Sequence, residues 1–342
     1  MTTATFTRAA GMGPLPRLLE QARGLRAVER VFRAEGLPLW LAHDQSSNLP
    51  VRCLTGLIER AAREIGDELF GVNLGHAMQP EDFGPVIQYM ASATNIGDLL
   101  RRSVRALRYH TSGAEFNFVL LEDHARWEIR AVEQIFSGRR HYIDHAVYPM
   151  LTALRRYLGP KWSPLRIELD YDRPFCWRAT EHRFQVPVVY GCATNAVVFE
   201  KRFLKAPAMR QLAIANTLSW QDLRRLVMQR PPRTSVEATR EVVRLRLLES
   251  SVDIDGAARL LGVGARTLQR QLAEDNFTYR DLVQQVRMGR AVDLLNETSE
   301  SITSIAYSLG YSDVASFTRV FRQWTGFPPS HFRRPNLPPH RA

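Results

Sequence analysis

Cysteine is scarce in this sequence: only Cys53, Cys176 and Cys192 occur in 342 residues. Their number is odd and their spacings match no metal-binding pair, so we expect free thiols and no zinc site. Long apolar runs are missing as well. No stretch approaches about 18 uninterrupted apolar residues, and the start of the chain lacks the apolar core of a secretion signal. These absences predict a cytoplasmic protein with no membrane segment.

The motifs of common enzyme classes are also missing. The sequence has no Gly-x-Ser-x-Gly nucleophile motif, no Walker phosphate loop, no dinucleotide-binding glycine fingerprint and no paired zinc-spaced cysteines. We therefore expect neither catalysis nor a cofactor.

The chain does contain a helical hairpin between residues 302 and 332. Ser301 can cap the first helix and Gly310 can end it with a positive φ. A second helix, with Ser312 as its expected cap, places four apolar residues on a face that we expect to be buried: Phe317, Val320, Phe321 and Trp324. Its opposite face carries short or forked polar groups suited to a DNA groove: Asp313, Ala315, Ser316, Arg319 and Arg322.

A second copy of the hairpin lies upstream, at residues 254–272. Ala258 and Gly262 correspond to Ala306 and Gly310 at a constant offset, and such an internal repeat is stronger evidence than either copy alone. Residues 278–297 between the copies read as one connecting helix. It has a probable capping box of Thr278 with Asp281, and a glycine, Gly289, that suggests close packing.

Residues 234–334 resemble the DNA-binding domain of the AraC/XylS family of bacterial transcription regulators. The residues that carry the resemblance follow the family's order and spacing: Leu268-Gln-Arg270, Arg287, Arg290-Ala291, Ile305-Ala306, Leu309-Gly310-Tyr311-Ser312, Phe317, Arg319, Phe321, Trp324-Thr-Gly326, Pro329 and Phe332-Arg333. The resemblance implies an all-α domain with two helix-turn-helix units, whose second helices enter successive major grooves. It also implies DNA contacts from Ala265, Arg266, Gln269 and Arg270 in the first unit and from Asp313, Ala315, Ser316 and Arg319 in the second. Because Val314 and Ala315 stand where many members have polar groups, we expect more of the specificity from the first unit.

The formal net charge of +11 is unevenly distributed. Residues 201–232 carry seven basic residues and one acidic residue, whereas residues 233–342 carry 15 and 12. Either this connector lies along the DNA backbone, or it is a solvated basic linker. We expect an effector-binding or dimerisation domain over residues 1–205, the linker over 206–232 and the DNA-binding domain over 233–335.

The first 205 residues mix helical and strand patterns, which favours an α+β domain. We expect helices over 52–69, 96–109 and 139–158, a loop over 71–85, a β-hairpin of 114–121 with 125–132, and strands at 165–170 and 196–199. Two stretches resemble the arabinose-binding-like effector domain of one AraC/XylS subgroup: Phe83-Gly84-Pro85 to Tyr109, and Phe184 to Pro207. The resemblance implies a sensor that binds a small molecule or a partner and controls dimerisation or the posture of the DNA-binding domain.

Some residues of this domain suggest a binding site. His141 and His145 are four apart on a predicted helix, but no third ligand stands out, so we predict no metal. They join the aromatic candidates for an effector pocket, for which the alternative is plain core: Trp127, Phe136 and Tyr142. Four arginines either receive an anionic effector or form a solvated helix face: Arg101, Arg102, Arg105 and Arg108.

The sequence thus predicts a ligand-responsive transcription regulator, with activator favoured over repressor by the resemblance. It would bind double-stranded promoter DNA as a homodimer, associate with the nucleoid and recruit RNA polymerase. Two alternatives remain. One is a regulator without an effector, whose first domain only dimerises. The other is an enzyme fused to the DNA-binding domain, which would need an activated cysteine that none of the three supplies.

Overall fold

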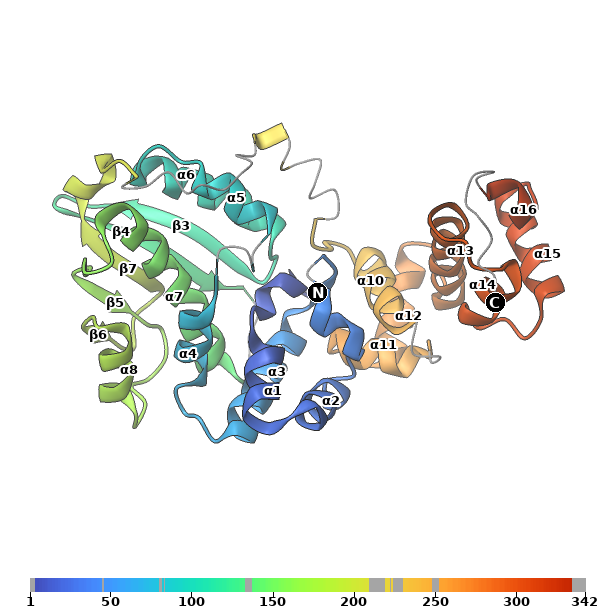
Figure 1. Ribbon diagram of the computed structural model, residues 1–342, viewed down its shortest axis with the longest axis horizontal. Coiled ribbons are helices and arrows are strands. Elements are labelled where there is room, and N and C mark those ends of the chain that lie inside the picture. Colours follow the sequence, from blue (N-terminus) through green and yellow to red (C-terminus); the bar gives the residue numbers. More distant parts are fainter. Residues whose placement is uncertain are drawn as a thin grey trace. The chain divides into compact units, whose positions relative to one another are not determined.

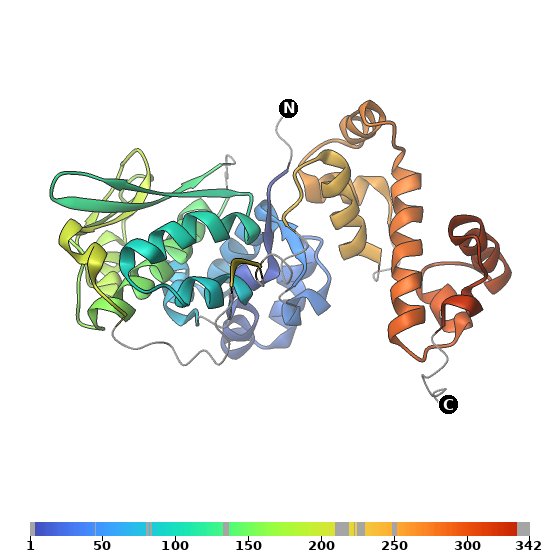
Figure 2. The ribbon, with the colours of Figure 1, turned by 90° about the horizontal axis from the view of Figure 1, so that it is seen from above.

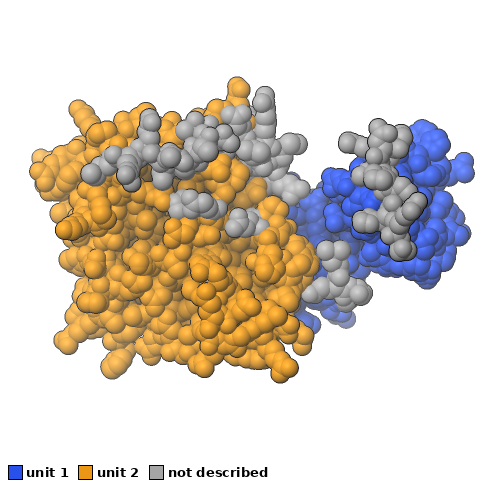
Figure 3. Space-filling model, in the orientation of Figure 1, with its two compact units in different colours: residues 1–4, 234–342 blue, residues 5–233 orange. Residues whose placement is uncertain are grey.

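The computed structural model describes residues 4–333 except 45, 80–81, 83, 133–136, 209–218, 222, 224–229 and 248–251. The chain forms two compact units (Figure 3): an N-terminal unit of residues 5–233, and a C-terminal unit of residues 234–342 together with residues 1–4. Within the described ranges, no helix combines the length and the apolar character needed to cross a membrane.

The N-terminal unit combines helices with a β-sheet, which confirms the predicted α+β class. Its α-helices are α1 (Leu15–Arg23), α2 (Leu25–Ala34), α3 (Val51–Ile65), α4 (Phe70–Ala77), α5 (Pro85–Ala91), α6 (Ile96–Ala106), α7 (Arg139–Leu158) and α8 (Trp177–Phe184) (Figure 1). Short 3-10 helices lie at Ala9–Met12, Leu39–His43, Leu107–Tyr109 and Lys201–Lys205. The helices predicted over 52–69, 96–109 and 139–158 correspond to α3, to α6 with the following 3-10 turn, and to α7.

Five strands form a mixed sheet in the order β3-β4-β7-β5-β6. Antiparallel pairs join β3 (Ala114–Leu120), β4 (His124–Ala131), β7 (Asn195–Glu200) and β5 (Arg166–Glu168), whereas β6 (Val188–Val189) runs parallel to β5. A separate two-stranded sheet pairs β1 (Phe6–Arg8) with β2 (Asn48–Pro50). The predicted hairpin and both predicted strands are confirmed. Helix α6 packs against β3, and α7 packs against β7.

Alternation along β4 separates the core from the surface. Ala125, Trp127 and Ile129 are buried, whereas Arg126, between Ala125 and Trp127, points to the other face, where its guanidinium lies 2.7 Å from the carboxylate of Glu168. Successive side chains of a strand lie on opposite faces of a sheet, which explains this pattern.

The segment 71–85 differs from the prediction. We expected a loop, but it contains most of α4 and leads into α5. A Cβ atom added to Gly71 would lie 2.3 Å from the carbonyl oxygen of His141, and one added to Gly75 would lie 2.7 Å from Cβ of Tyr148. The two glycines therefore let α4 approach α7 closely, and this packing outweighs the helix-propensity cost of about 1 kcal/mol for each glycine.

The C-terminal unit is all-helical, as predicted. It contains α10 (Ser235–Leu247), α11 (Ile254–Leu261), α12 (Ala265–Glu274), α13 (Tyr279–Glu297), α14 (Ile302–Ser308), α15 (Val314–Thr325) and α16 (Pro329–Phe332). The predicted connecting helix, α13, stands between the hairpin α11–α12 and the hairpin α14–α15 (Figure 2). Its capping box of Thr278 and Asp281 is confirmed.

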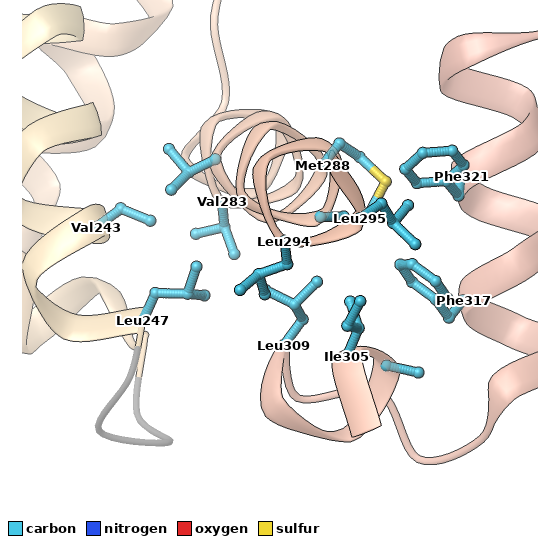
Figure 4. Packing of buried hydrophobic residues seen from close by; sticks show 13 residues of the cluster. Val243, Leu247, Val283, Met288, Leu294, Leu295, Ile305, Leu309, Phe317 and Phe321 are labelled. Atoms are coloured by element: carbon cyan, nitrogen blue, oxygen red, sulfur yellow. The ribbon is translucent and has the colours of Figure 1, made fainter. Parts of the chain in front are cut away.

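One apolar cluster fixes the second hairpin on α13. Figure 4 shows Phe317 and Phe321 of α15 directed toward Met288 and Leu295 of α13, and all four side chains are fully buried. Burial of each such side chain contributes about 1.5–3 kcal/mol, so the hairpin is held as part of the domain core.

Three local expectations for this unit are wrong. Trp324 is 46% exposed, because Phe332 of α16 covers Phe321 at a ring distance of 5.2 Å and the core ends there. Gly289 does not mark close packing, since no atom lies within 4 Å of where its Cβ would be. The cap of α15 is Asp313 rather than Ser312.

Candidate nucleic-acid interface

Each hairpin turns at a glycine in the left-handed region. Gly262 follows α11 with a φ of 71°, and Gly310 follows α14 with a φ of 80°. A residue with a Cβ is disfavoured by about 1–2 kcal/mol in this conformation, which explains why both copies have glycine there.

The start of each hairpin is also built in the same way. The side chains of Asp253 and Ser301 cap α11 and α14 by accepting hydrogen bonds from backbone N–H groups one turn ahead. An arginine from outside the hairpin then binds the carbonyl groups just before or at the cap. Arg246 of α10 donates to the Asp253 carbonyl at 2.7 Å, and Arg333 donates to the carbonyl of Glu300. The repeat therefore includes the supports of the hairpins as well as their helices.

The second helix of the first hairpin, α12, separates an inner from an outer face. Leu268 and Leu272 are buried. Three predicted DNA-binding residues project from the surface as exposed side chains: Arg266, Gln269 and Arg270. Ala265 is half-buried at the start of the helix. The guanidinium of Arg270 lies 4.0 Å from the carboxylate of Glu274, a long and exposed pairing.

The second helix of the second hairpin, α15, borders an open surface hollow. Five predicted DNA-binding residues belong to this helix or its cap, and three of them line the hollow: Ala315, Arg319 and Arg322. Sequence reasoning missed Thr318 and Gln323, which line the same hollow. Helical spacing could have found them, because Thr318 follows the predicted Ala315 by three residues and Gln323 follows the predicted Arg319 by four.

Asp313 and Ser316 bind each other as well as facing outward. The Asp313 carboxylate accepts hydrogen bonds from the backbone N–H of Ser316 at 2.7 Å and from its hydroxyl at 2.9 Å. These bonds hold the pKa of Asp313 below its usual value, with the backbone bond as the largest cause. The first turn of α15 therefore carries a fixed negative charge.

Three outer arginines of the two helices differ from Arg270 in their ionic contacts. Within the described part of the chain, no carboxylate forms an ion pair with Arg266, Arg319 or Arg322, in contrast to Arg244 and Arg246 of α10. Two exposed helices of one compact unit thus present guanidinium groups without a described carboxylate partner, which suits the phosphates and guanine edges of DNA.

Comparison with known proteins finds a family match for each of the two parts of the chain. Residues 26–208 match the arabinose-binding domain of AraC transcription regulators, and residues 257–335 match a helix-turn-helix domain. The first match alone spans more than half of the chain. The chain belongs to the AraC family of transcription regulators. It is a DNA-binding transcriptional regulator with an effector-type N-terminal domain.

Individual relatives of this AraC-family chain support the same assignment. It is 26% identical over 280 residues to the ornithine utilization regulator of Pseudomonas aeruginosa, covering 78% of this chain and 79% of that protein. The regulator VqsM of the same organism is 42% identical over 76 residues, 22% of this chain and 23% of its own length. The crystal structure of the regulator CdpR from P. aeruginosa matches 90% of this chain and 96% of its own at 23% identity and a TM-score of 0.43, too low to bear on the fold.

The effector-pocket candidates of the AraC-family regulator lie in the core of its N-terminal unit. Trp127, Tyr142, His141 and His145 are each at most 5% exposed, and Phe136 lies outside the described residues. The N–H of Gly71 donates to Nδ1 of His141 at 3.2 Å. Burial lowers the pKa of His141 and of His145 to about 4, so both rings are neutral at pH 7. In this structure, these four side chains are packed within the core.

The same unit has a buried carboxyl beside the two histidines. Asp144 accepts a hydrogen bond from the hydroxyl of Tyr171, and burial raises its pKa to about 7. No group of three potential metal ligands comes together among the described residues.

A small hollow lies between α5, α6 and α7. It is lined mainly by apolar side chains, with Arg156 and Tyr157 from α7, and its volume is about 40 Å³. Ligand pockets usually measure roughly 300–1,000 Å³, so this hollow as it stands is too small for an effector.

Proposed function

We propose that the protein is a ligand-responsive, homodimeric activator that acts in the cytoplasm, carries out no catalysis, and recruits RNA polymerase to promoters. In each protomer, α12 and α15 would enter two successive major grooves, about 34 Å apart. The effector or dimerisation domain would occupy residues 1–205, the linker 206–232 and the DNA-binding domain 233–335. Of that linker, the structure describes residues 206–208, 219–221, 223 and 230–232.

The main observation behind the proposal is a pair of hairpins, each held at its start by a capping side chain and an arginine. The outer faces of their second helices carry Arg266, Arg319 and Arg322, which form no ion pair with a described carboxylate. Nine residues would contact DNA: Ala265, Arg266, Gln269, Arg270, Asp313, Ala315, Ser316, Arg319 and Arg322. Arg266, Gln269 and Arg319 have the length and exposure for base edges. Asp313 and Ser316 bind each other, so they would face the DNA as a hydrogen-bonded pair at the start of α15.

The test begins with selection of genomic fragments by the purified full-length protein at fixed salt. Repeated half-sites spaced by whole helical turns are expected in the retained sequences. If the retained fragments share no sequence, the proposal is refuted.

Variants then assign the contacts on a selected site. Arg266→Ala and Arg319→Ala should each weaken binding by about 1–3 kcal/mol and relax one base position, or else reduce the salt slope by about 1 if the arginine contacts a phosphate. The matched control is Arg244→Ala, an exposed arginine of the same unit that pairs with Glu241 at 3.0 Å. Unchanged affinity, preference and salt slope in both test variants would remove these side chains from the interface.

A further inference from the structure

A box of aromatic and cationic side chains on the N-terminal unit encloses Trp220. Tyr89 of α5 and Tyr109 of the 3-10 turn after α6 lie 5.5 and 5.6 Å from the Trp220 ring, the latter edge-on at 77°. The guanidinium of Arg105 stacks on the indole at 3.7 Å, and that of Arg108 lies at 6.0 Å. We call Tyr89, Tyr109, Arg105 and Arg108 the indole box.

The indole box holds a residue of the predicted linker. Leu223, one turn after Trp220, is fully buried, so the contact is an anchored helical turn rather than a single side chain on the surface. A flat ring between an edge-on tyrosine and a guanidinium uses both edge-to-face and cation–π attraction, which recognise aromatic rings of any origin.

The arginines of α6 differ in the described carboxylates that they contact. Arg102 and Arg101 of α6 face Asp98, at 3.0 and 4.0 Å. Arg105 and Arg108, by contrast, form no ion pair with any carboxylate in the described ranges. An indole supplies a ring but no negative charge. A planar ring that carries a carboxylate would supply both, since guanidinium groups bind carboxylates strongly.

We propose that the indole box is the effector site of this regulator, and that its ligand is a planar aromatic acid that takes the place of the Trp220 ring. The proposal rests on the ligand-responsive function proposed above. Because Trp220 belongs to the segment that leads to the DNA-binding domain, ligand binding would release that segment from the N-terminal unit. The tethered indole competes at a high effective concentration, so the wild-type protein binds the acid more weakly than a protein without this side chain.

The test uses the full-length Trp220→Ala variant, in which the box is vacated, and indole-3-acetate as the probe. Calorimetry should show binding about tenfold or more tighter than to the wild type. Indole-3-acetamide, which has the same ring but no charge, should bind more weakly than the acid. Addition of Arg105→Ala should abolish both the binding and the preference for the acid.

Two further variants control for folding and for nonspecific stacking. Trp220→Phe keeps a ring in the box and should behave as the wild type. Trp177→Ala removes another tryptophan that lies between two arginines, Arg173 and Arg178 at 5.1 and 5.2 Å, but outside the box. It should create no binding.

Equal binding of the acid to wild type and Trp220→Ala, or no binding to Trp220→Ala when its circular dichroism matches the wild type, would overturn the inference. Equal affinity for acid and amide would overturn the assignment of an acid. Operator selection by the wild-type protein is measured separately, so failure here and failure of the regulator function are distinguishable.

Discussion

Replacing Gly310 by alanine should destabilise the C-terminal unit, whereas the same change at Gly289 should stabilise it. Gly310 has a φ of 80°, in which an L-residue costs about 1–2 kcal/mol. The new Cβ would also lie 3.2 Å from Nη2 of Arg287. This atom is the free end of a long side chain, so the contact adds little. We expect a loss of about 1–2 kcal/mol.

Gly289 provides the matched control within the same unit. It lies inside α13, and a Cβ there would meet no atom within 4 Å. Alanine is favoured over glycine in a helix by about 1 kcal/mol. The two alanine variants should therefore differ by roughly 2–3 kcal/mol in the free energy of unfolding, with opposite signs relative to the wild type.

Urea unfolding of the full-length protein measures this difference. Pulsed hydrogen exchange on peptides from residues 279–325 reports the C-terminal unit alone. With a urea dependence of about 1–3 kcal/mol per M, the two midpoints should lie on the order of 1 M apart. If Gly310→Ala raises the midpoint as Gly289→Ala does, the left-handed turn is not required and the account of both hairpin turns fails. Operator affinity of Gly310→Ala should fall as well, since this turn orients α15.

Three further predictions concern a hairpin support, the edge of the C-terminal core and a buried histidine of the N-terminal unit. Arg246→Met removes the bonds to Asp253. Hydrogen exchange should therefore become faster in residues 254–261 and stay unchanged in residues 302–308. If the substitution changes exchange in both segments equally, Arg246 does not support the first hairpin. Trp324→Ser should change stability by less than about 0.5 kcal/mol, whereas Phe321→Ala should cost about 3–5 kcal/mol in the same unfolding assay. His141 has its pKa lowered to about 4, mainly by burial, so its stabilisation is present above pH 6.5 and declines as the pH falls toward 4. His141→Gln should remove up to about 1.4 kcal/mol per pH unit from the slope of stability against pH between 6 and 4.5, and an unchanged slope would show that this ring does not titrate on unfolding.

The C-terminal domain could be predicted well because its determinants are local. The caps at Ser301 and Thr278, the turn at Gly310 and the apolar spacing within each helix all lie within a few residues of the feature they fix. Trp324 could not be placed in this way. Helical periodicity shows which face is apolar, but where the covering element ends depends on Phe332, which lies in another helix.

The N-terminal unit could be predicted less well, because its features depend on contacts between residues that are far apart in the sequence. Gly71 and Gly75 indicate a loop by propensity, and only the contact with α7 makes them helical. The indole box could not be predicted either, because it joins α5 and α6 to a residue about a hundred positions later in the chain. The arginines of α6 were candidates from their spacing. Asp98, three residues before Arg101, marks that arginine locally as paired, but nothing local shows that Arg105 stacks on an indole from the linker.

The two hairpins are copies in sequence, but they differ where their outer helices begin. Helix α12 starts at Gly264 with no side chain bound to its first N–H groups, whereas α15 starts at Asp313, whose carboxylate occupies that position. The open positive end of a helix attracts phosphate, and a carboxylate there repels it. We therefore expect α12 to approach the DNA backbone end-on, which brings Arg266 and Gln269 to the groove. We expect helix α15 to contact DNA through its flank instead, where Arg319 and Arg322 border the surface hollow. This difference in chemistry gives a physical reason to expect more of the sequence specificity from the first hairpin.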